Sequence, residues 1–458
     1  MKRFRVPAGA FLGAVVAACC AWLLFYSRAT VTRAAEKAMQ EEVERGNFSG
    51  AVLVSRDGHI VFERAYGFAD ANRKVPNTTR TRFLLGSITK SFTAVLVMQL
   101  DQEKRLSLGD SICKYLQECP AGWQAITLHH LLSHTSGIFN VTEAAEFERL
   151  KSIAQTRGQM LARMLHQPLA FAAGQKFHYS NSNYYLLGIV IENVTGESFA
   201  HVLQRRILDP LRMRDTGMSR DDSLLAGQTH GYRRDATGTY EDDPPMHESW
   251  AFSAGGMYST LRDLATFSNA LAAGKLLPRA ALERMWRPIK GEYGYGFQTP
   301  AASGWSFDRR MVEHGGRMPG FVTMFQRYVD DGVTVIVLSN HIDAAPARVA
   351  RGLGAAIFEV PYQSVFERKP IKVSSEVLQK FAGEYEFDGM RFSLFQKDGE
   401  LFARVGEAPE VSLHFESESA FFVDGMEGTV VALEDSKGAV TGLSVPVRGS
   451  MREARRLH

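Results

Sequence analysis

The feature that most constrains this chain is the run Phe92–Leu100, which is apolar on nearly every side. A helix that is apolar around its whole circumference is buried in a core instead of lying at a surface. The run therefore requires a domain large enough to surround it. Ser87 and Lys90 stand directly before it in FLLGSITKS, and a lysine at the mouth of a buried helix is costly to desolvate unless it is paired or its pKa falls. The segment is either an ordinary capped helix start or a reactive centre.

The chain is long enough to supply such a core. Its 458 residues, 45% of them hydrophobic, are sufficient for one large domain and a smaller one. The 53 basic and 50 acidic residues leave a formal net charge of +3. This near balance gives no electrostatic reason to expect nucleic acid as a partner.

The N-terminal segment, residues 1–29, has the pattern of an export signal. It begins with Lys2, Arg3 and Arg5 and continues as an apolar run to Tyr26. A basic start before an apolar run is typical of a signal peptide or an uncleaved signal anchor, and this run is just long enough to span a bilayer. We expect export to the periplasm or the extracellular space, with the segment either cleaved or retained as an inner-membrane anchor. A buried N-terminal helix of a cytosolic protein is the weaker alternative.

Two cysteines lie outside that segment, Cys113 and Cys119 in SICKYLQECP. In an oxidising compartment they could close a small disulfide loop. Two free thiols are about equally compatible with the sequence. Metal binding would need further ligands at matching spacing, and none stands nearby.

The residues after the leader alternate between helical and strand-like patterns. VTRAAEKAMQEEVERG predicts an amphipathic helix, and SGAVLVSRDGHIVFERAYGFAD predicts a hairpin around Asp57-Gly58. Residues 127–210 are mostly helical, and Thr260 with Asp263 predicts a capping box at a later helix. Strand-like runs return with YGYGFQ, MFQRYVDD and GVTVIVLSN. We expect the first hairpin and these late strands to share one antiparallel sheet, with the helical middle as a lobe beside it.

The sequence pattern changes at about Lys369, where strand-like alternation and turn residues become predominant. RFSLFQKDGELFARV predicts a second Asp-Gly hairpin, and Val411, Leu413 and Phe415 alternate with polar residues in VSLHFESESAFFV. We expect residues 370–458 to form strands and turns without a helix. They predict a small separate β-barrel or sandwich.

The pair Ser87 and Lys90 is a Ser-x-x-Lys motif, which is weak alone and gains weight from its context. Residues i and i+3 of a helix share a face, so the Lys90 amine would lie beside the Ser87 hydroxyl. The helix N-terminus favours a developing alkoxide and offers a free backbone N–H. A buried lysine with a lowered pKa can then take the serine proton. The competing interpretation is that Ser87 only caps the helix.

Two further motifs follow in order: Tyr179-Ser180-Asn181 in FHYSNSNYYLLG and His314-Gly315-Gly316 in VEHGGRMPGF. The order Ser-x-x-Lys, Tyr-x-Asn and a basic residue before glycine resembles the serine β-lactamase and penicillin-binding protein superfamily. It is most similar to the class C β-lactamase, D-aminopeptidase and esterase branch, peptidase family S12. GAVLVSRDG, ITLHHLLSHTSGI and AFSAGGMYSTLRDLATF are also similar to that family. The resemblance covers roughly residues 40–345.

The resemblance implies an α/β (α+β) fold over residues 30–365, in which helices flank an antiparallel sheet and an all-helical lobe lies beside it. It implies that Ser87 is the acylated nucleophile and that Lys90 is its base partner. Tyr179 would be a general base shared with Lys90 and the proton donor to the leaving group. A phenol titrates at about pH 10, so nearby cations would be needed to favour the phenolate.

The same resemblance implies the substrate contacts. Asn181 would orient the lysine and hold a substrate carbonyl or amide. The strand after His314 would line the substrate, and the backbone N–H groups of Arg317 and Ser87 would form the oxyanion hole. Glycines at 315 and 316 suit that role, because a strand without side chains lets a substrate approach the backbone closely.

The sequence departs from the family pattern at His314, where β-lactamases and penicillin-binding proteins usually carry lysine. Lysine there attracts a substrate carboxylate, whereas histidine, with an unperturbed pKa of about 6.5, is mostly neutral. This weakens the case for a dedicated β-lactamase or carboxypeptidase. Relatives with histidine at this position resemble D-aminopeptidases and esterases, some of which also carry a C-terminal lipocalin-like barrel.

His130 and His134 stand four apart on an expected helix, a spacing that can bind zinc. No acid or third ligand accompanies them, so helix packing and capping explain them better. We expect neither a metal nor an organic cofactor, because splitting a hydrolysis into acylation and deacylation requires none.

The sequence therefore predicts an exported serine hydrolase that acts through an acyl-enzyme on a small-molecule or peptide substrate with an amide or ester bond. Three alternatives remain: a penicillin-binding or β-lactam-sensing protein with little turnover, a true β-lactamase, and a non-enzymatic scaffold with a vestigial site. Neither the natural substrate nor the oligomeric state is predicted.

Overall fold

The structure is a computed structural model, and it describes residues 29–219, 229–235, 239–302, 306–361, 368–387, 389–406, 410–423, 428–447 and 450–457. The leader predicted at residues 1–29 lies outside the described residues except for its last position. The chain divides into two compact units. One extends through Ala301 and resumes at Arg310–Glu359, and the other comprises Ala302–Arg309 and Val360–His458.

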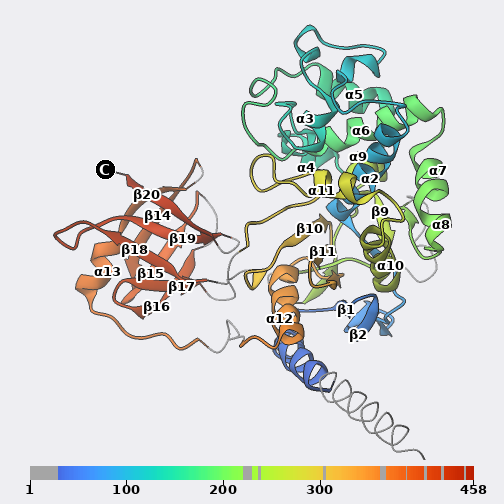
Figure 1. Cartoon of the computed structure of the whole chain (residues 1–458). Helices are drawn as coiled ribbons and strands as arrows, with labels where there is room; N and C mark the ends of the chain where they lie inside the picture. The colour runs from blue at the N-terminus through green and yellow to red at the C-terminus, as the bar shows by residue number, and fades with distance from the viewer. Residues whose placement is uncertain are drawn as a thin grey trace, which may run out of the picture. The chain divides into compact units, whose positions relative to one another are not determined.

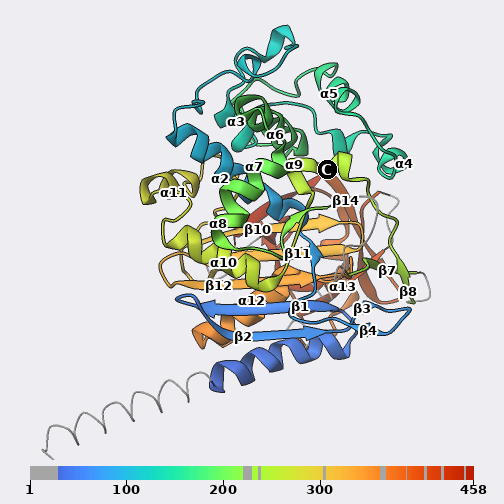
Figure 2. The same ribbon diagram turned by 90° about the vertical axis from the view of Figure 1, so that its right-hand side faces the viewer.

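The first unit is built on a five-stranded antiparallel sheet of order β10-β11-β12-β1-β2 (Figure 2). Its strands are β1 (Gly50–Arg56), β2 (His59–Tyr66), β10 (Met311–Met318), β11 (Phe321–Tyr328) and β12 (Val333–Ser339). Gly50 pairs with Ser339 on one side and with Tyr66 on the other. The prediction that the first hairpin and the late strands share one sheet is therefore confirmed.

Helices lie on both faces of this sheet (Figure 1), which is why β11 and β12 are buried at every position. The helices are α2 (Thr89–Gln102), α3 (Leu128–Leu132), α4 (Phe147–Leu150), α5 (Arg157–Leu165), α6 (Asn181–Thr195), α7 (Phe199–Leu203), α8 (Asp209–Leu211), α9 (Glu248–Gly255), α10 (Leu261–Ala272), α11 (Arg279–Met285) and α12 (Pro346–Phe358). Residues 29–44 are also helical. Helical turns occur at η1 (Gly86–Ile88), η2 (Ile112–Lys114), η3 (Ala121–Trp123), η4 (Val141–Glu143) and η5 (Gln204–Leu208).

Short strands complete this unit. They are β3 (Phe68–Asp70), β4 (Val75–Pro76), β5 (Phe83–Leu84), β6 (Gly217–Met218), β7 (Tyr232–Arg234), β8 (Tyr240–Asp242) and β9 (Met257–Ser259). They pair in three small sheets, β3-β4, β5-β9-β6 and β7-β8. The middle sheet places β5, just before Ser87, beside β9.

Two local predictions need correction. YGYGFQ, residues 293–298, is not a strand but a turn with isolated bridges. Gly296 has φ +69°, which is outside the extended region of a strand. A Cβ at this position would lie 2.7 Å from the Lys90 carbonyl oxygen, so the turn packs closely against α2. Only half of the predicted capping box forms. The Thr260 side chain accepts from the Asp263 amide, but the Asp263 carboxylate turns instead to the Asp215 amide and the Thr216 hydroxyl, at 2.9 and 2.8 Å.

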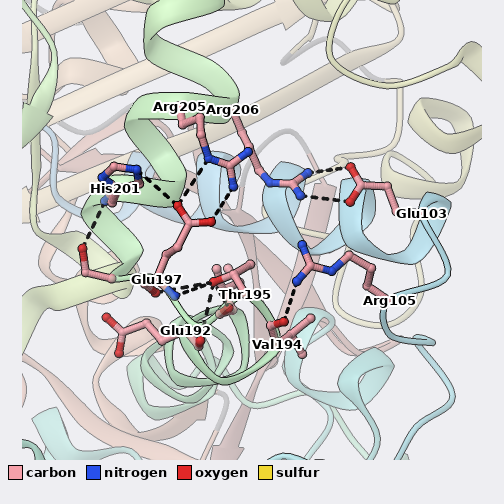
Figure 3. Close-up of polar contacts among 11 residues, drawn as sticks. Glu103, Arg105, Glu192, Val194, Thr195, Glu197, His201, Arg205 and Arg206 are labelled. Carbon is pink, nitrogen blue, oxygen red and sulfur yellow. Dashed lines mark hydrogen bonds and ion pairs between the residues drawn. The ribbon is translucent and has the colours of Figure 1, made fainter.

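Helix α2 is enclosed as its composition predicts, with residues 89–98 and Leu100 all buried. Figure 3 shows how its C-terminal end is held. Arg206, in the π-helical turn η5, donates to both Glu103 oxygens at 2.6 and 2.9 Å. Arg105 donates to the Val194 carbonyl at 2.6 Å. An ion pair near the surface is worth at most about 1 kcal/mol, so the Arg206–Glu103 pair orients the helix end more than it stabilises the fold.

The helical lobe contains the two cysteines. Cys113 and Cys119 form a disulfide in the structure. Among the described residues no single helix is long and apolar enough to cross a bilayer. The bent pair Asn181–Thr195 and Phe199–Leu211, at 80° to each other, passes the length and composition test together.

The second unit is a closed eight-stranded antiparallel barrel, β13 to β20 in sequence order, closed by pairing of β13 with β20. The strands are β13 (Gly383–Phe387), β14 (Met390–Lys397), β15 (Glu400–Arg404), β16 (Val411–Ser417), β17 (Ala420–Val423), β18 (Val430–Glu434), β19 (Val440–Val447) and β20 (Ser450–Leu457). The predicted barrel is confirmed, and the alternative of a sandwich is excluded by the closure.

The prediction that this region lacks a helix is wrong. Helix α13 (Ser375–Phe381) precedes the barrel strands, capped by Ser374, whose side chain accepts from the Val377 amide. Phe381 is fully buried, with its ring centroid 5.2 Å from that of Phe415 and 5.6 Å from that of Phe421. The apolar spacing of Val377, Leu378 and Phe381 is helical, so the signal was present in the sequence.

Candidate active site

Ser87 lies in the turn η1, directly before helix α2 begins at Thr89. The residue that caps α2 is Ile88, and neither η1 nor α2 has a side-chain cap. The competing interpretation of Ser87 as a helix cap therefore does not hold. Its hydroxyl is half-buried and faces Lys90 instead, with 2.8 Å between Oγ and Nζ.

Lys90 is fully buried, at 0% exposure. Its Nζ lies 2.8 Å from Asn181 Oδ1 and 2.7 Å from the Ala254 carbonyl oxygen, besides Ser87 Oγ. Within the described ranges no carboxylate forms an ion pair with it. Burial without a counter-charge lowers the pKa of Lys90 well below its usual range.

These contacts determine what the amine can do. Asn181 Oδ1 and the Ala254 carbonyl can only accept hydrogen bonds, so each takes one N–H of Lys90. An uncharged amine has two N–H groups and one lone pair. In the uncharged state both N–H groups would be engaged by these acceptors, which leaves the lone pair for Ser87 Oγ. These contacts fit the orientation of a base for the serine proton.

A break in helix α9 brings the Ala254 carbonyl to Lys90. Phe252 has φ +34° and ψ −132°, which interrupts the helix just before Ser253 and Ala254. The Ser253 carbonyl accepts from Thr93 Oγ1 at 2.7 Å, so both freed carbonyls bond to α2 side chains. A strained non-glycine residue persists only where its surroundings hold it, and Phe252 packs beneath the Arg157 guanidinium, 3.9 Å from the ring centroid.

Asn181 is held from its other side. It is the first residue of α6, its backbone N–H donates to Asn140 Oδ1 at 3.0 Å, and its Nδ2 donates to Thr142 Oγ1 at 2.9 Å. Because the Nδ2 group is engaged by Thr142, the amide oxygen is the atom presented to Lys90. The local sequence thus fixes which end of the amide meets the amine.

Tyr179 lies over the same amine, with its ring centroid 4.9 Å from Lys90 Nζ. The His134 ring stacks against Tyr179 at 4.3 Å and 34°. Burial lowers the pKa of His134 well below its usual range, and the charge of Lys90 lowers it further. Its Nδ1 accepts from the Ser180 amide at 3.1 Å, so the proton of the neutral ring lies on Nε2.

Strand β10 approaches the Ser87 turn at backbone distance. A Cβ on Gly316 would lie 1.8 Å from the Leu85 carbonyl oxygen, and a Cβ on Gly86 (φ +54°) would lie 2.6 Å from the Arg317 nitrogen. Glycine is therefore required at 86 and 316, because the protein's own backbone occupies the space that a side chain would need. The sequence alone suggests another reason for the glycine at 316, the approach of a substrate to the backbone. Gly315 has more room, since a Cβ there would lie 3.4 Å from its nearest neighbour, Met324 Cε.

His314 is buried, at 2% exposure, and both ring nitrogens have protein neighbours. Nδ1 lies 2.7 Å from the Gly315 carbonyl, which can only accept, so Nδ1 carries a proton. In the neutral ring Nε2 then accepts from the Tyr293 hydroxyl at 2.9 Å. Burial raises the pKa of Tyr293 well above its usual range, which keeps its proton available for that bond.

A pocket of about 430 Å³ opens beside Ser87. Its lining combines apolar side chains with charged ones: Ser87, Thr142, Phe147, Glu148, Lys151, Asn181, Asp243, Met246, Trp250, Ala251, Ala254, Gly255, Arg317, Met318, Pro319 and Ile342. Lys151 pairs with Glu148 at 2.6 Å. Arg317 is exposed, and within the described part of the chain its side chain has no hydrogen-bond or ion-pair partner. Of the predicted site residues, Ser87, Asn181 and Arg317 line this pocket, whereas Lys90, Tyr179, His314, Gly315 and Gly316 do not.

Sequence patterns do not indicate Tyr293 or His134 as parts of this site. Tyr293 stands in a glycine turn that the pattern predicts as a strand. His134 is expected on a helix with His130 but lies beyond the end of α3, with φ +55°. His130 serves the capping role considered above, because its Nδ1 accepts from the Thr127 amide at the start of α3. No group of three or more His, Cys, Asp or Glu side chains in the described ranges is arranged to hold a metal ion.

Comparison with known proteins agrees with this geometry. A profile of the family described as Beta-lactamase matches residues 33–357. Penicillin-binding protein 4* of Bacillus subtilis (strain 168) is 27% identical over 408 residues, which is 83% of this chain and 89% of that protein. The D-stereospecific amidohydrolase from Streptomyces sp. has a TM-score of 0.60 at 28% identity and covers 72% of this chain and 99% of its own. The octameric penicillin-binding protein homologue from Pyrococcus abyssi has a TM-score of 0.66 at 22% identity over 92% of this chain and 98% of its own.

Proposed function

The chain belongs to the Beta-lactamase family of serine hydrolases, and from that premise we propose that it hydrolyses amide or ester bonds through an acyl-enzyme on Ser87. The single observation that carries the proposal is the orientation of Lys90. A fully buried amine, with its two acceptors in place, lies 2.8 Å from the Ser87 hydroxyl. That is the arrangement of a base and the nucleophile it activates.

In the proposed acylation, Ser87 Oγ bonds to the substrate carbonyl carbon while its proton passes to Lys90 Nζ, and the carbonyl becomes an oxyanion. The backbone N–H groups of Ser87 and Arg317 would bind that oxyanion, supported by the close approach of residues 86 and 317. When the carbonyl re-forms, the leaving amine or alcohol departs with a proton from Tyr179, which Lys90 replenishes. Water then attacks the ester by the same route in reverse.

The state of His314 supports general amide or ester substrates over a dedicated β-lactamase. Its two nitrogens are engaged by Gly315 and Tyr293, and the ring is buried. Because both ring nitrogens already have protein neighbours, a substrate carboxylate would find no available donor on this side chain, where the family usually places lysine.

We also propose that the protein is exported by residues 1–29. The disulfide between Cys113 and Cys119 supports this, because disulfides persist in oxidising compartments outside the cytosol. Mass analysis of the protein purified from its native host tests the proposal by showing whether residues 1–29 are retained and in which fraction the protein is found. A reduced, cytosolic, full-length protein would contradict it.

A substrate panel tests the hydrolase. We expect p-nitrophenyl esters of short acids and D-aminoacyl p-nitroanilides to be turned over, with an acyl adduct on Ser87 visible by intact mass after rapid quenching. A chromogenic cephalosporin is the comparison substrate. A long-lived adduct with the cephalosporin and no turnover of the others would favour the penicillin-binding alternative, which the name of the Bacillus subtilis relative also favours. Neither adduct nor turnover would contradict both.

Replacing Tyr179 by phenylalanine should separate its two roles. The ring contacts with Lys90 and His134 remain, so we expect the melting temperature to stay within about 2 °C of wild type. Loss of a general acid typically costs about 100- to 10,000-fold in rate. We expect that loss in kcat/KM for the anilide, whose leaving group needs a proton, and a smaller loss for the p-nitrophenyl ester. Equal losses for both would show that Tyr179 does not protonate the leaving group.

A further inference from the structure

A second pocket of about 430 Å³ lies in the first unit, between the C-terminal end of α10, helix α11 and the end of β11. It shares no lining residue with the pocket beside Ser87. Strand β11 begins near Ser87, where Thr323 Oγ1 donates to the Leu85 carbonyl at 2.8 Å, and ends at this second pocket with Arg327. Strand β11 contributes Arg327 to the second pocket and no lining residue to the pocket beside Ser87.

Arg327 is the unusual group in this lining. It is 4% exposed, and its Nη1 donates to Ser268 Oγ at 3.0 Å and to Thr334 Oγ1 at 3.4 Å. Its Nε is buried and has no hydrogen-bond partner among the described residues. In the described part of the chain no carboxylate forms an ion pair with it. Burial lowers the pKa of Arg327, with the more distant charge of Asp57 acting in the opposite direction.

A second buried donor lines the same pocket. Trp286 is 6% exposed, and its Nε1–H has no hydrogen-bond partner among the described residues. Buried N–H groups in folded proteins are nearly always satisfied, by protein, water or ligand. Two unsatisfied donors, one of them cationic, therefore belong to one cavity.

The acids of the lining do not supply the missing counter-charge. Glu283 and Asp330 both pair with Arg310, and the hydrogen bond from Arg310 lowers the pKa of Glu283. Arg279, the remaining charged lining residue, is exposed and adds positive charge. A buried guanidinium bonded only to hydroxyls retains most of the cost of its desolvation, which an anion in contact with it would offset.

We propose that this second pocket binds a small organic anion, a carboxylate or a phosphate monoester with an apolar body, whose oxygens accept from Arg327 and Trp286. The apolar body would lie against Leu271, Leu282 and Val329, which also line the cavity. The site is independent of the hydrolase chemistry, because it uses no residue of the Ser87 pocket.

Three small probes of similar shape test the proposal on the whole protein: benzoate, phenyl phosphate and the neutral benzamide. We expect benzoate or phenyl phosphate to raise the melting temperature in a saturable manner and to bind in calorimetric titration, and benzamide to do neither. The ratio of benzoate to phenyl phosphate affinity distinguishes a carboxylate ligand from a phosphate ligand. The Ser87 site is acylated beforehand with a covalent serine probe, so that binding there does not contribute.

The decisive variant is Arg327→Met, which removes the charge and keeps most of the volume. We expect it to lose at least tenfold in benzoate or phenyl phosphate affinity. Arg284→Met, on the exposed face of α11 where Arg284 pairs with Asp101, is the matched control and should keep the wild-type response. Where Arg327→Met does not fold, Trp286→Phe replaces it, with an expected loss of at least fivefold. No saturable response of the wild type to either anion, or a response that persists in the Arg327 or Trp286 variant, would overturn the proposal.

Discussion

Replacing Ser87 with alanine should abolish hydrolysis and covalent labelling while the protein stays folded. The hydroxyl is the atom that the acyl group would occupy, and loss of a catalytic serine costs on the order of a million-fold in kcat. The side chain is half-buried and not a helix cap, so we expect the melting temperature to change by only a few degrees. Steady-state rates and labelling with a fluorophosphonate serve as the measurements.

Ser152→Ala is the control for that experiment. Ser152 is exposed in the same unit, outside the pocket beside Ser87, and the variant should keep both labelling and turnover. Hydrolysis by pure Ser87→Ala at more than a thousandth of the wild-type rate would rule out the acyl-enzyme mechanism on this residue.

Replacing Lys90 with methionine should remove nearly all activity, by about a thousandfold or more, because the amine that lies 2.8 Å from Ser87 Oγ and is placed to take its proton is lost. In the wild type, kcat/KM should fall as the pH drops below the lowered pKa of Lys90, since the protonated amine has no lone pair for the serine proton. Lys114→Met, which removes an exposed lysine paired with Asp110, is the matched control and should leave the pH profile unchanged.

Lys90→Met should also change how the stability of the protein depends on pH. The folded-state pKa of Lys90 is below its unfolded value, so between the two the unfolded chain holds a proton that the native state lacks. The free energy of unfolding of the wild type therefore increases as the pH rises from the folded-state pKa to the unfolded-state pKa. Below the folded-state pKa, the native state bears the full cost of burying the charged amine. The melting temperature of Lys90→Met minus that of wild type should therefore decrease from pH 6 to pH 9. A difference independent of pH would contradict a lowered pKa for Lys90.

Local patterns were enough to predict most of the scaffold. The apolar run around Lys90 predicted a buried helix, and alternation predicted the strands of the sheet and the barrel. The resemblance to the serine β-lactamase and penicillin-binding protein superfamily predicted that Lys90 lies beside Tyr179 and Asn181, and the structure brings these residues together. The helix and strand patterns succeed because each depends on residues close to one another in the sequence.

What the sequence did not predict depends on contacts between distant segments. The Tyr293 hydroxyl meets His314 only because a glycine turn folds against α2, and nothing in YGYGFQ indicates that partner. The sequence around Arg327 predicts only a buried strand. That the guanidinium has no counter-charge among the described residues depends on how α10 and α11 pack against it. Tertiary packing determines side-chain neighbours of this kind, and the hydrophobic periodicity of a sequence does not predict them.

The pairing of β1 with β12 also governs when the first unit can be completed during biosynthesis. Gly50 finds its partner only when Ser339 has left the ribosome, and a lone hairpin such as β1–β2 is at best marginally stable in water. Six of the seven β1 residues are buried in the complete sheet. A nascent chain would therefore expose this apolar, unpaired strand edge for most of its translation. Unpaired strand edges and exposed apolar surface of this kind favour aggregation, so the interval before β12 is synthesised is when the chain is most exposed to it.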